Sequence, residues 1–326
     1  MDVARVGVLR GGRGHEYGVS LKTGESILRH LPEDKYLGHD ILITKDGQWH
    51  WSGLPVTPQE VGKRVDVFFN ALHGEYGEDG KIQNQLDMLG VPYTGSGTFA
   101  SAAGMNKVVA NKIFRQAGLR VPHGILLTCE SGLVDEINAL ARKAFNRVPP
   151  RWMIKPVAGG SSIGVYMAKN FDALLEAIYR ASRYSKQILV EQFIGGREAT
   201  CGVIDNFRDI DHYALPPIEI RKPGGQAVWS YNDKYSGETE EICPGNFSDD
   251  ERRQISEMAV AAHKALGLRH YSRADFILSP QGIYLLEVNT LPGMTKESLM
   301  PKGLEAVGCS YDDFLDHILS LTMGRR

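Results

Sequence analysis

The chain of 326 residues is poor in cysteine, has no long apolar run and carries almost no net charge. Its four cysteines lack the close spacing of a zinc site or a disulfide framework, which is usual in a reducing compartment. It contains no run of about 18 apolar residues, so we expect no membrane span. The 37 basic and 39 acidic residues nearly cancel, which argues against a general binder of nucleic acid or of membrane surfaces.

The N-terminal residues lead directly into a strand-like segment, with neither a long apolar region nor a cleavage signal. We therefore expect a cytoplasmic protein. The apolar content of 42% and the charged content of 23% are typical of globular proteins. A chain of this length can form two or three domains with their own cores.

The first hundred residues alternate strand-like and helical segments. We predict strands at residues 5–9, 41–44 and 65–72, and helices at 20–31 and 79–89. This alternation is typical of βαβ units and predicts a parallel sheet.

A second region opens with a helix at 106–116, closed by Gly118. Two further helices are predicted at 133–145 and 171–182. They alternate with strands predicted at 152–155, 165–168 and 188–192.

The third region begins near Arg197 and contains a polar, glycine-rich stretch at 221–247. Such a stretch is long for a loop without structure, and a functional lid is one usual explanation. A capping box formed by Ser248 and Glu251 predicts the start of the helix that follows the stretch.

Two strand-like segments near the C-terminus, 272–278 and 283–289, flank the sequence Pro280-Gln281-Gly282. A Pro-x-Gly sequence suits a three-residue hairpin loop. Alternate residues of a strand share a face, so we expect Ile277 and Leu285 to form an apolar part of one common surface.

The same register places Asp275 opposite Glu287, and Arg273 opposite Asn289. Two carboxylates about 5 Å apart repel by roughly 3 kcal/mol at an effective dielectric constant near 20. A divalent cation removes that repulsion, and carboxylate and amide oxygens are ligands that suit Mg²⁺. The pattern therefore favours a magnesium site, with a solvated acidic face as the alternative.

A phosphate-binding loop is a candidate in the second region. Lys155 ends a predicted strand, and the glycine-rich sequence 159–164 follows it. Backbone N–H groups of such a loop can bind phosphate, and a lysine can neutralise it. The sequence is not a Walker A loop, and an ordinary hairpin turn explains the glycines equally well. A neighbouring Mg²⁺ site favours the phosphate interpretation, because phosphoryl transfer needs both.

Other signals are weaker. The glycines at 12–14 and 95–100 do not have the spacing and context of a dinucleotide-binding fingerprint. His73 follows a buried strand, where ligand groups gather in open α/β sheets, although a structural histidine fits equally well. Glu16 could bind an ammonium group, and Lys107 lies near a helix start, although residues in such positions are more often solvated.

Taken together, these motifs resemble those of the D-alanine–D-alanine ligases of the ATP-grasp superfamily. The segments that carry the resemblance run nearly end to end, at 71–74, 77–80, 92–97, 105–107, 155–156, 160–164, 191–194, 197–198, 234–235, 286–295 and 298–299.

The resemblance implies an α/β protein of three-domain ATP-grasp architecture. An N-terminal parallel α/β domain at 1–104 would bind substrate. Two α+β domains would clasp ATP, the central one at 105–192 and the C-terminal one, with the metal site and lid, at 193–326. A homodimer is implied by the resemblance alone.

The implied reaction joins two molecules of D-alanine for peptidoglycan precursors. ATP would phosphorylate the first carboxylate, and the second amino group would attack the acyl phosphate. The lid would exclude water, which hydrolyses an acyl phosphate. A ligase with D-serine, D-lactate or another amino acid as acceptor is the alternative, and Lys234-Tyr235 argues for an amino acceptor. The retained charged residues argue against a non-catalytic nucleotide-binding module.

The resemblance also assigns roles to individual residues around ATP. Those implied to contact the phosphates, the adenine or the ribose are Lys107, Lys155, Gly160, Ser162, Glu191, Gln192, Phe193, Ile194, Glu198 and Lys234. Those implied to bind two Mg²⁺ ions, with Mn²⁺ as a substitute, are Asp275, Glu287 and Asn289.

A second group is implied to act on the amino acids. Arg273 and the Gly293 N–H would stabilise the developing oxyanion. The first substrate's ammonium group would meet Glu16, with His73 nearby. Ser161 and Tyr235 would tie down the lid. Ser298 and Leu299 would receive the carboxylate of the second substrate.

Three positions depart from the family pattern. Gly159 stands where many members carry an acidic residue, Gly18 where a second glutamate often follows, and Gln192 where a lysine is frequent. These departures concern nucleotide affinity and lid strength rather than the class of reaction.

Overall fold

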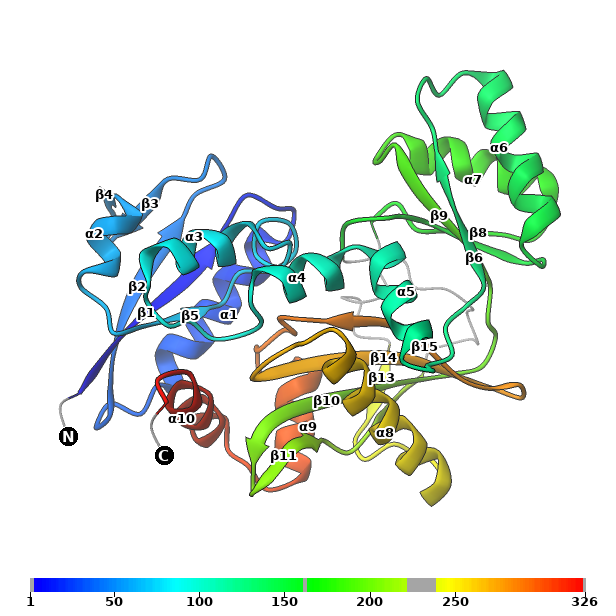
Figure 1. The fold of residues 1–326 in the computed structure, drawn as a ribbon. Helices are drawn as coiled ribbons and strands as arrows, with labels where there is room; N and C mark the ends of the chain where they lie inside the picture. The colour runs from blue at the N-terminus through cyan, green and yellow to red at the C-terminus, as the bar shows by residue number, and fades with distance from the viewer. Residues whose placement is uncertain (1–2, 161–162, 222–238, 325–326) are drawn as a thin grey trace.

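The computed structural model describes residues 3–160, 163–221 and 239–324, which form three β-sheets with their own helices. The first sheet and its helices lie at the left of Figure 1, the second stands apart at the upper right, and the third lies between and below them. No helix in these ranges combines the length and the apolar character needed to cross a membrane.

The first sheet has the strand order β4-β3-β2-β1-β5. Its strands are β1 (Ala4–Gly11), β2 (Tyr36–Ile43), β3 (Trp49–Trp51), β4 (Leu54–Val56) and β5 (Val67–Asn70). β1 is parallel to β2 and β5, as predicted, but β3 and β4 add an antiparallel edge. That edge was missed because its strands have only three residues each, too few for a clear alternation.

Helices cover both faces of the first sheet. On one face, α1 (Tyr17–His30) packs together with the last helix, α10 (Tyr311–Thr322), which returns from the C-terminus (Figure 1). On the other face lie α2 (Pro58–Gly62) and α3 (Lys81–Leu89), and α4 (Thr98–Met105) leads away toward the rest of the chain.

The second sheet is antiparallel, with the order β6-β9-β7-β8. Its helices α6 and α7 pack their apolar stripes on one face, around the buried Trp152. The bounds are β6 (Gly124–Thr128), α6 (Val134–Arg147), β7 (Trp152–Pro156), β8 (Tyr166–Ala168), α7 (Phe171–Ser182) and β9 (Gln187–Gln192).

The third sheet has the order β13-β12-β10-β14-β15, and β11 pairs with β10. The strands are β10 (Arg197–Phe207), β11 (Ile210–Ala214), β12 (Ile218–Arg221), β13 (Glu240–Ile242), β14 (Tyr271–Ser279) and β15 (Gly282–Asn289). The helices are α5 (Lys107–Gln116), α8 (Asp249–Ala265) and α9 (Leu299–Ala306). α5 and α8 share one apolar core with one face of the sheet, and α8 starts at the predicted capping box.

The charged hairpin has the predicted register, but it reaches that register by a different route. Ser279 pairs with Gly282, so the turn is one residue shorter than predicted. The register then shifts between Asp275 and Phe276, which restores the expected polar pairs. Leu285 consequently pairs with Phe276 on the face that packs against α8. The prediction that Leu285 shares a surface with Ile277 is therefore wrong.

Candidate active site

The polar face of the β14–β15 hairpin forms the floor of the site. Arg273 lies directly opposite Asn289, and Asp275 opposite Glu287, as predicted. Arg273 donates Nε and Nη2 hydrogen bonds of 3.0 and 2.9 Å to the two oxygens of Asp275. Asn289 Nδ2 (3.0 Å) and Thr200 Oγ1, from the neighbouring β10, also donate to that carboxylate (2.6 Å). Asp275 is therefore held in a fixed orientation, and its charge is compensated.

Glu287, in contrast, is half-buried and has neither a hydrogen bond nor an ion pair with any residue that the structure describes. Its charge still acts on two cations. Burial opposes the charged form of Lys155, but Glu191 and then Glu287 outweigh burial and raise the pKa of Lys155. Arg273 behaves alike: Asp275 and Glu287 outweigh burial and raise its pKa. A carboxylate that has no hydrogen bond to a described residue and lies opposite a second, fixed carboxylate fits a divalent cation.

Lys155, at the end of β7, brings a buried positive charge from the second sheet. Its Nζ lies 2.9 Å from Glu191 Oε2 on β9, and the two side chains are 14% and 2% exposed. Asn111, on α5, donates to Glu191 Oε1 at 2.7 Å. The carboxylate of Glu191 thus fixes the lysine, and the influence of Glu287 on the pKa of that lysine indicates that the end of β7 lies near the β14–β15 hairpin.

The glycine-rich loop receives a second amine. Lys107 Nζ donates to the Gly159 carbonyl at 2.7 Å, and the Lys107 N–H donates to the Val157 carbonyl at 3.0 Å. Lys107 and Lys155 therefore both lie beside this loop, in keeping with a phosphate site. Ser161 and Ser162 lie outside the described residues.

The N-terminal domain contributes Glu16, which precedes α1. A Cβ atom placed on Gly74 would lie 2.1 Å from Glu16 Oε2, and one placed on Gly160 would lie 3.1 Å from the same oxygen. The carboxylate therefore rests against the backbone of two loops that belong to different domains. Gly74 also has a φ of +64°, so a side chain there is disfavoured for two reasons.

His73 is buried beside Glu16 and joins two domains. Its Nε2 lies 2.8 Å from Thr23 Oγ1, and its Nδ1 lies 3.0 Å from the Leu291 carbonyl oxygen. Burial lowers the pKa of His73, although Glu16 opposes the shift, so we expect a neutral ring. The histidine has the internal partners of a structural residue, and its contact with substrate stays a prediction.

Glu78 is the residue that sequence reasoning missed. Its carboxylate accepts hydrogen bonds from the Gly74 N–H (2.8 Å), the Leu291 N–H (3.0 Å) and Thr290 Oγ1 (3.3 Å). It therefore ties the loop after β5 to the loop after β15. The sequence Gly-Glu-Asp-Gly just after His73 was a signal for it, but no role followed from that motif alone.

The pKa of Glu78 predicts an effect of pH on stability. Burial, assisted by the charge of Glu16, raises this pKa from 4.5 to about 7. Between these values the folded chain binds more protons than the unfolded chain, so stability falls as the pH rises. We expect Glu78 to contribute a loss of up to about 3 kcal/mol across this window. Urea unfolding of the wild type and of Glu78→Gln at several pH values measures it, since the variant should show a flatter dependence. Equal slopes in the two proteins would contradict the prediction.

The segment after β15 forms the far side of the site. Ser298 immediately precedes α9, and its Oγ accepts a hydrogen bond from the Thr295 N–H at 3.1 Å. A Cβ atom on Gly293 would lie 2.9 Å from the same Oγ, so the Gly293 backbone approaches it closely. Leu299 is the first residue of the helix. Free N–H groups at a helix N-terminus suit a carboxylate.

The segment predicted to line an adenine connects the second and third sheets. The Gln192 N–H donates to the His123 carbonyl at 2.7 Å, and the Phe193 N–H donates to the Arg151 carbonyl at 2.8 Å. The Glu191 side chain turns toward Lys155, as described above. Glu198 follows this segment and lies on β10, where it pairs with Ile277 of β14. The nucleotide contacts of these residues stay predictions.

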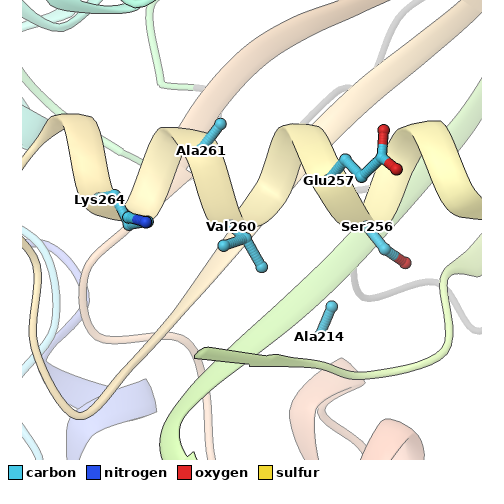
Figure 2. A pocket seen from close by; sticks show the side chains of 6 residues that line it. All are labelled: Ala214, Ser256, Glu257, Val260, Ala261 and Lys264. Carbon is cyan, nitrogen blue, oxygen red and sulfur yellow. The ribbon is translucent and has the colours of Figure 1, made fainter. Parts of the chain in front are cut away.

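Lys234 and Tyr235 of the predicted lid lie outside the described residues. A shallow groove between α8 and β11 is separate from the site (Figure 2). α8 packs on the sheet face opposite to Arg273 and Asp275, so the groove lies behind the hairpin. It is lined by Ala214, Ser256, Glu257, Val260, Ala261 and Lys264.

Comparison with known proteins gives consistent matches. The family model described as D-ala D-ala ligase N-terminus matches residues 53–96, and that described as D-ala D-ala ligase C-terminus matches residues 113–320. The D-alanine–D-alanine ligase of Pelotomaculum thermopropionicum is 37% identical over 321 residues, with 98% of this chain and 96% of the relative covered. That of Geobacter sulfurreducens is 37% identical over 324 residues, with 98% and 94% covered.

Two solved structures are similar over nearly their whole lengths. The VanG D-Ala:D-Ser ligase of Enterococcus faecalis has a TM-score of 0.86 at 27% identity, with 98% of this chain and 100% of that chain covered. The D-alanine–D-alanine ligase of Bacillus anthracis, complexed with ATP, has a TM-score of 0.77 at 29% identity, with 99% and 98% covered.

Proposed function

Because this chain belongs to the D-alanine–D-alanine ligase family and has its ATP-grasp fold, we propose that it joins two D-alanine molecules in an ATP-dependent reaction. One observation supports the chemistry of this proposal most directly. Glu287 lies near enough to Lys155 of the second sheet and to Arg273 of the third to raise the pKa of both. Cations bind nucleotide phosphates directly and carboxylates bind them through Mg²⁺, so the convergence of both kinds of group from two sheets suits a nucleotide.

The two lysines and the β14–β15 hairpin would bind the phosphates of ATP and their metal ions. Lys155 and Lys107, with the backbone of the loop at Gly159 and Gly160, neutralise and orient the transferred phosphoryl group. Asp275, Glu287 and Asn289 would hold two Mg²⁺ ions, or Mn²⁺. When bound, these ions supply Lewis-acid neutralisation of the phosphate oxygens.

The two D-alanine substrates would be bound by other groups of the site. Glu16 binds the ammonium group of the first D-alanine, beside His73. Arg273 and the Gly293 N–H then stabilise the oxyanion that develops when the second amino group attacks the acyl phosphate. The second carboxylate is received at the start of α9, by Ser298 and Leu299.

The reaction is tested by phosphate release from ATP and Mg²⁺ in the presence of D-alanine, with L-alanine as the control. We expect release that depends on D-alanine, and a product with the mass of the dipeptide. The absence of D-alanine-dependent release would contradict the proposal.

A second candidate activity uses a different acceptor. The similarity to a D-Ala:D-Ser ligase structure supports testing it. Mixtures of D-alanine with D-serine or D-lactate, read by product mass, distinguish the two. A predominance of the mixed product would favour the second activity.

Glycine 74 gives a specific test of Glu16. Alanine there would place its Cβ 2.1 Å from Glu16 Oε2, so the carboxylate must move. We expect Gly74→Ala to raise the KM for the first D-alanine by about tenfold or more, the effect of roughly 1.4 kcal/mol in binding. Gly90→Ala is the matched control, because Gly90 has a similar φ of +67° and no heavy atom within 4 Å of its added Cβ. Equal KM values in the two variants would contradict the role of Glu16.

We further propose that the enzyme acts in the cytoplasm as a homodimer and supplies the dipeptide for peptidoglycan precursors, as the family membership suggests. Sedimentation analysis of the purified chain tests the dimer: we expect twice the chain mass of 36.0 kDa.

A further inference from the structure

A second cluster of polar side chains lies well away from the proposed active site. Asp205, near the end of β10, is surrounded by four histidines: His212 on β11, His263 on α8, His270 before β14, and His317 on α10. Asp205 lies five residues along β10 from Thr200, whose hydroxyl donates to Asp275 of the site, and five strand residues span about 16 Å. None of these five residues takes part in the proposed reaction.

Three of these side chains present their atoms to one point. His212 Nδ1 lies 2.9 Å from Asp205 Oδ1, and His263 Nε2 lies 3.1 Å from the same oxygen. All three ligand atoms lie within 4.8 Å of one another. Around a tetrahedral ion with bonds of about 2.0–2.1 Å, neighbouring ligand atoms are roughly 3.3 Å apart. Two of the three spacings are therefore close to those of a tetrahedral site.

His263 provides an independent indication. The side chain is fully buried, and its Nδ1 lies 2.7 Å from Ser272 Oγ. Its Nε2 forms a close pair with Asp205 Oδ1 at 3.1 Å, but the angle falls short of a well-formed hydrogen bond with any described residue. A poorly directed contact of a buried nitrogen is costly, whereas a metal ion held between the two groups would use the lone pair of the nitrogen. Ser272 would then hold the ring orientation from the other side, as partners of ligating histidines usually do.

The surroundings also fix the carboxylate. Asp205 Oδ2 accepts the His270 N–H at 2.6 Å, and His317 Nε2 lies 2.8 Å from the Asp205 carbonyl oxygen. These contacts leave Oδ1 directed at His212 and His263. His212 is 29% exposed, which gives a path from solvent. The groove of Figure 2 follows the same seam between α8 and β11.

We propose that Asp205, His212 and His263 form a binding site for a divalent transition metal ion, with Zn²⁺ favoured. Two imidazoles and one carboxylate with near-tetrahedral spacing suit Zn²⁺ better than Mg²⁺ or Ca²⁺, which prefer all-oxygen sites. A water molecule would complete the coordination. The ion would tie the β10–β11 hairpin to α8, and because the unfolded chain has no preformed site, binding would stabilise the fold.

The test uses Co²⁺ as a spectroscopic probe, added to the full chain after chelation and dialysis. The Glu287→Gln variant is used throughout, so that the proposed catalytic metal site does not contribute. We expect one Co²⁺ per chain with the intense visible absorption of tetrahedral coordination, displaced by Zn²⁺. His212→Ala should weaken binding by at least about tenfold. His30→Ala, on α1, is the matched control and should bind as tightly as its parent.

A thermal measurement covers the case in which His212→Ala disturbs the fold. Zn²⁺ should raise the unfolding midpoint of the parent protein, and a chelator should reverse the increase. If Co²⁺ shows no stoichiometric tetrahedral spectrum, or if Zn²⁺ leaves the midpoint unchanged, the cluster is a hydrogen-bonded network only and the proposal is overturned. Neither reading depends on ligase activity, so the result is separate from that for the proposed function.

Discussion

Replacing Glu287 by glutamine is expected to lower kcat by at least about 10³-fold while the fold stays intact. The carboxylate faces Asp275 across the hairpin and acts on both Lys155 and Arg273. The neutral amide would weaken the proposed magnesium binding and misplace the phosphates. Because Lys155 keeps its ion pair with Glu191 and Arg273 keeps its ion pair with Asp275, the loss of Glu287 leaves neither buried cation without a partner. We therefore expect the unfolding midpoint to change by less than about 3 °C.

The measurement is the phosphate released in the presence of ATP and D-alanine, together with the Mg²⁺ concentration required for half-maximal rate. That concentration should rise in the variant. Glu176→Gln is the matched control, because it removes a carboxylate that is 54% exposed on α7. An unchanged rate in Glu287→Gln would show that the metal assignment is wrong.

Replacing Lys155 by methionine is expected to have two separable effects. The first is a loss of stability of about 3 kcal/mol or more, because Glu191 is only 2% exposed and would keep a buried charge without its cation. The second is a fall in kcat of about 10²-fold or more, because the phosphoryl group loses a positioned positive charge. Urea unfolding and the phosphate assay measure the two effects.

The double variant Lys155→Met with Glu191→Gln separates structure from catalysis. The neutral amide can still accept the hydrogen bond from Asn111 while it removes the stranded charge. We expect most of the stability to return and the activity to stay low. If activity returned together with stability, Lys155 would act only as the partner of Glu191, and its contact with phosphate would be disproved.

Much of the local structure was predictable because it depends on short-range patterns. The pairs Asp275–Glu287 and Arg273–Asn289 follow from alternation along two strands, and the start of α8 follows from a capping box. Even there, the turn was predicted one residue too long. The predicted polar pairs are nevertheless correct, because a bulge between Asp275 and Phe276 shifts the register by one residue. The bulge places Phe276 and Leu285 in the core shared with α8, a partner that the sequence of the hairpin alone does not reveal.

The arrangement of the site was less predictable, because it depends on contacts between residues far apart in the chain. Glu16 meets Gly160 only after the N-terminal and central domains have come together. Glu78 bonds to Leu291, which is 213 residues away. The cluster around Asp205 has the same origin, since its histidines come from separate helices and strands. Family resemblance indicated some of these residues, but no local pattern specifies such distances.

The central claim is that the β14–β15 hairpin holds divalent cations beside the phosphates of a nucleotide. It is tested most directly by anomalous diffraction from crystals grown with Mn²⁺ and a non-hydrolysable ATP analogue. We predict anomalous peaks at bonding distance from Asp275, Glu287 and Asn289, with the terminal phosphate on the side of Lys155. Ordered nucleotide without a peak at these residues, or with Glu287 turned away from the phosphates, would contradict the account.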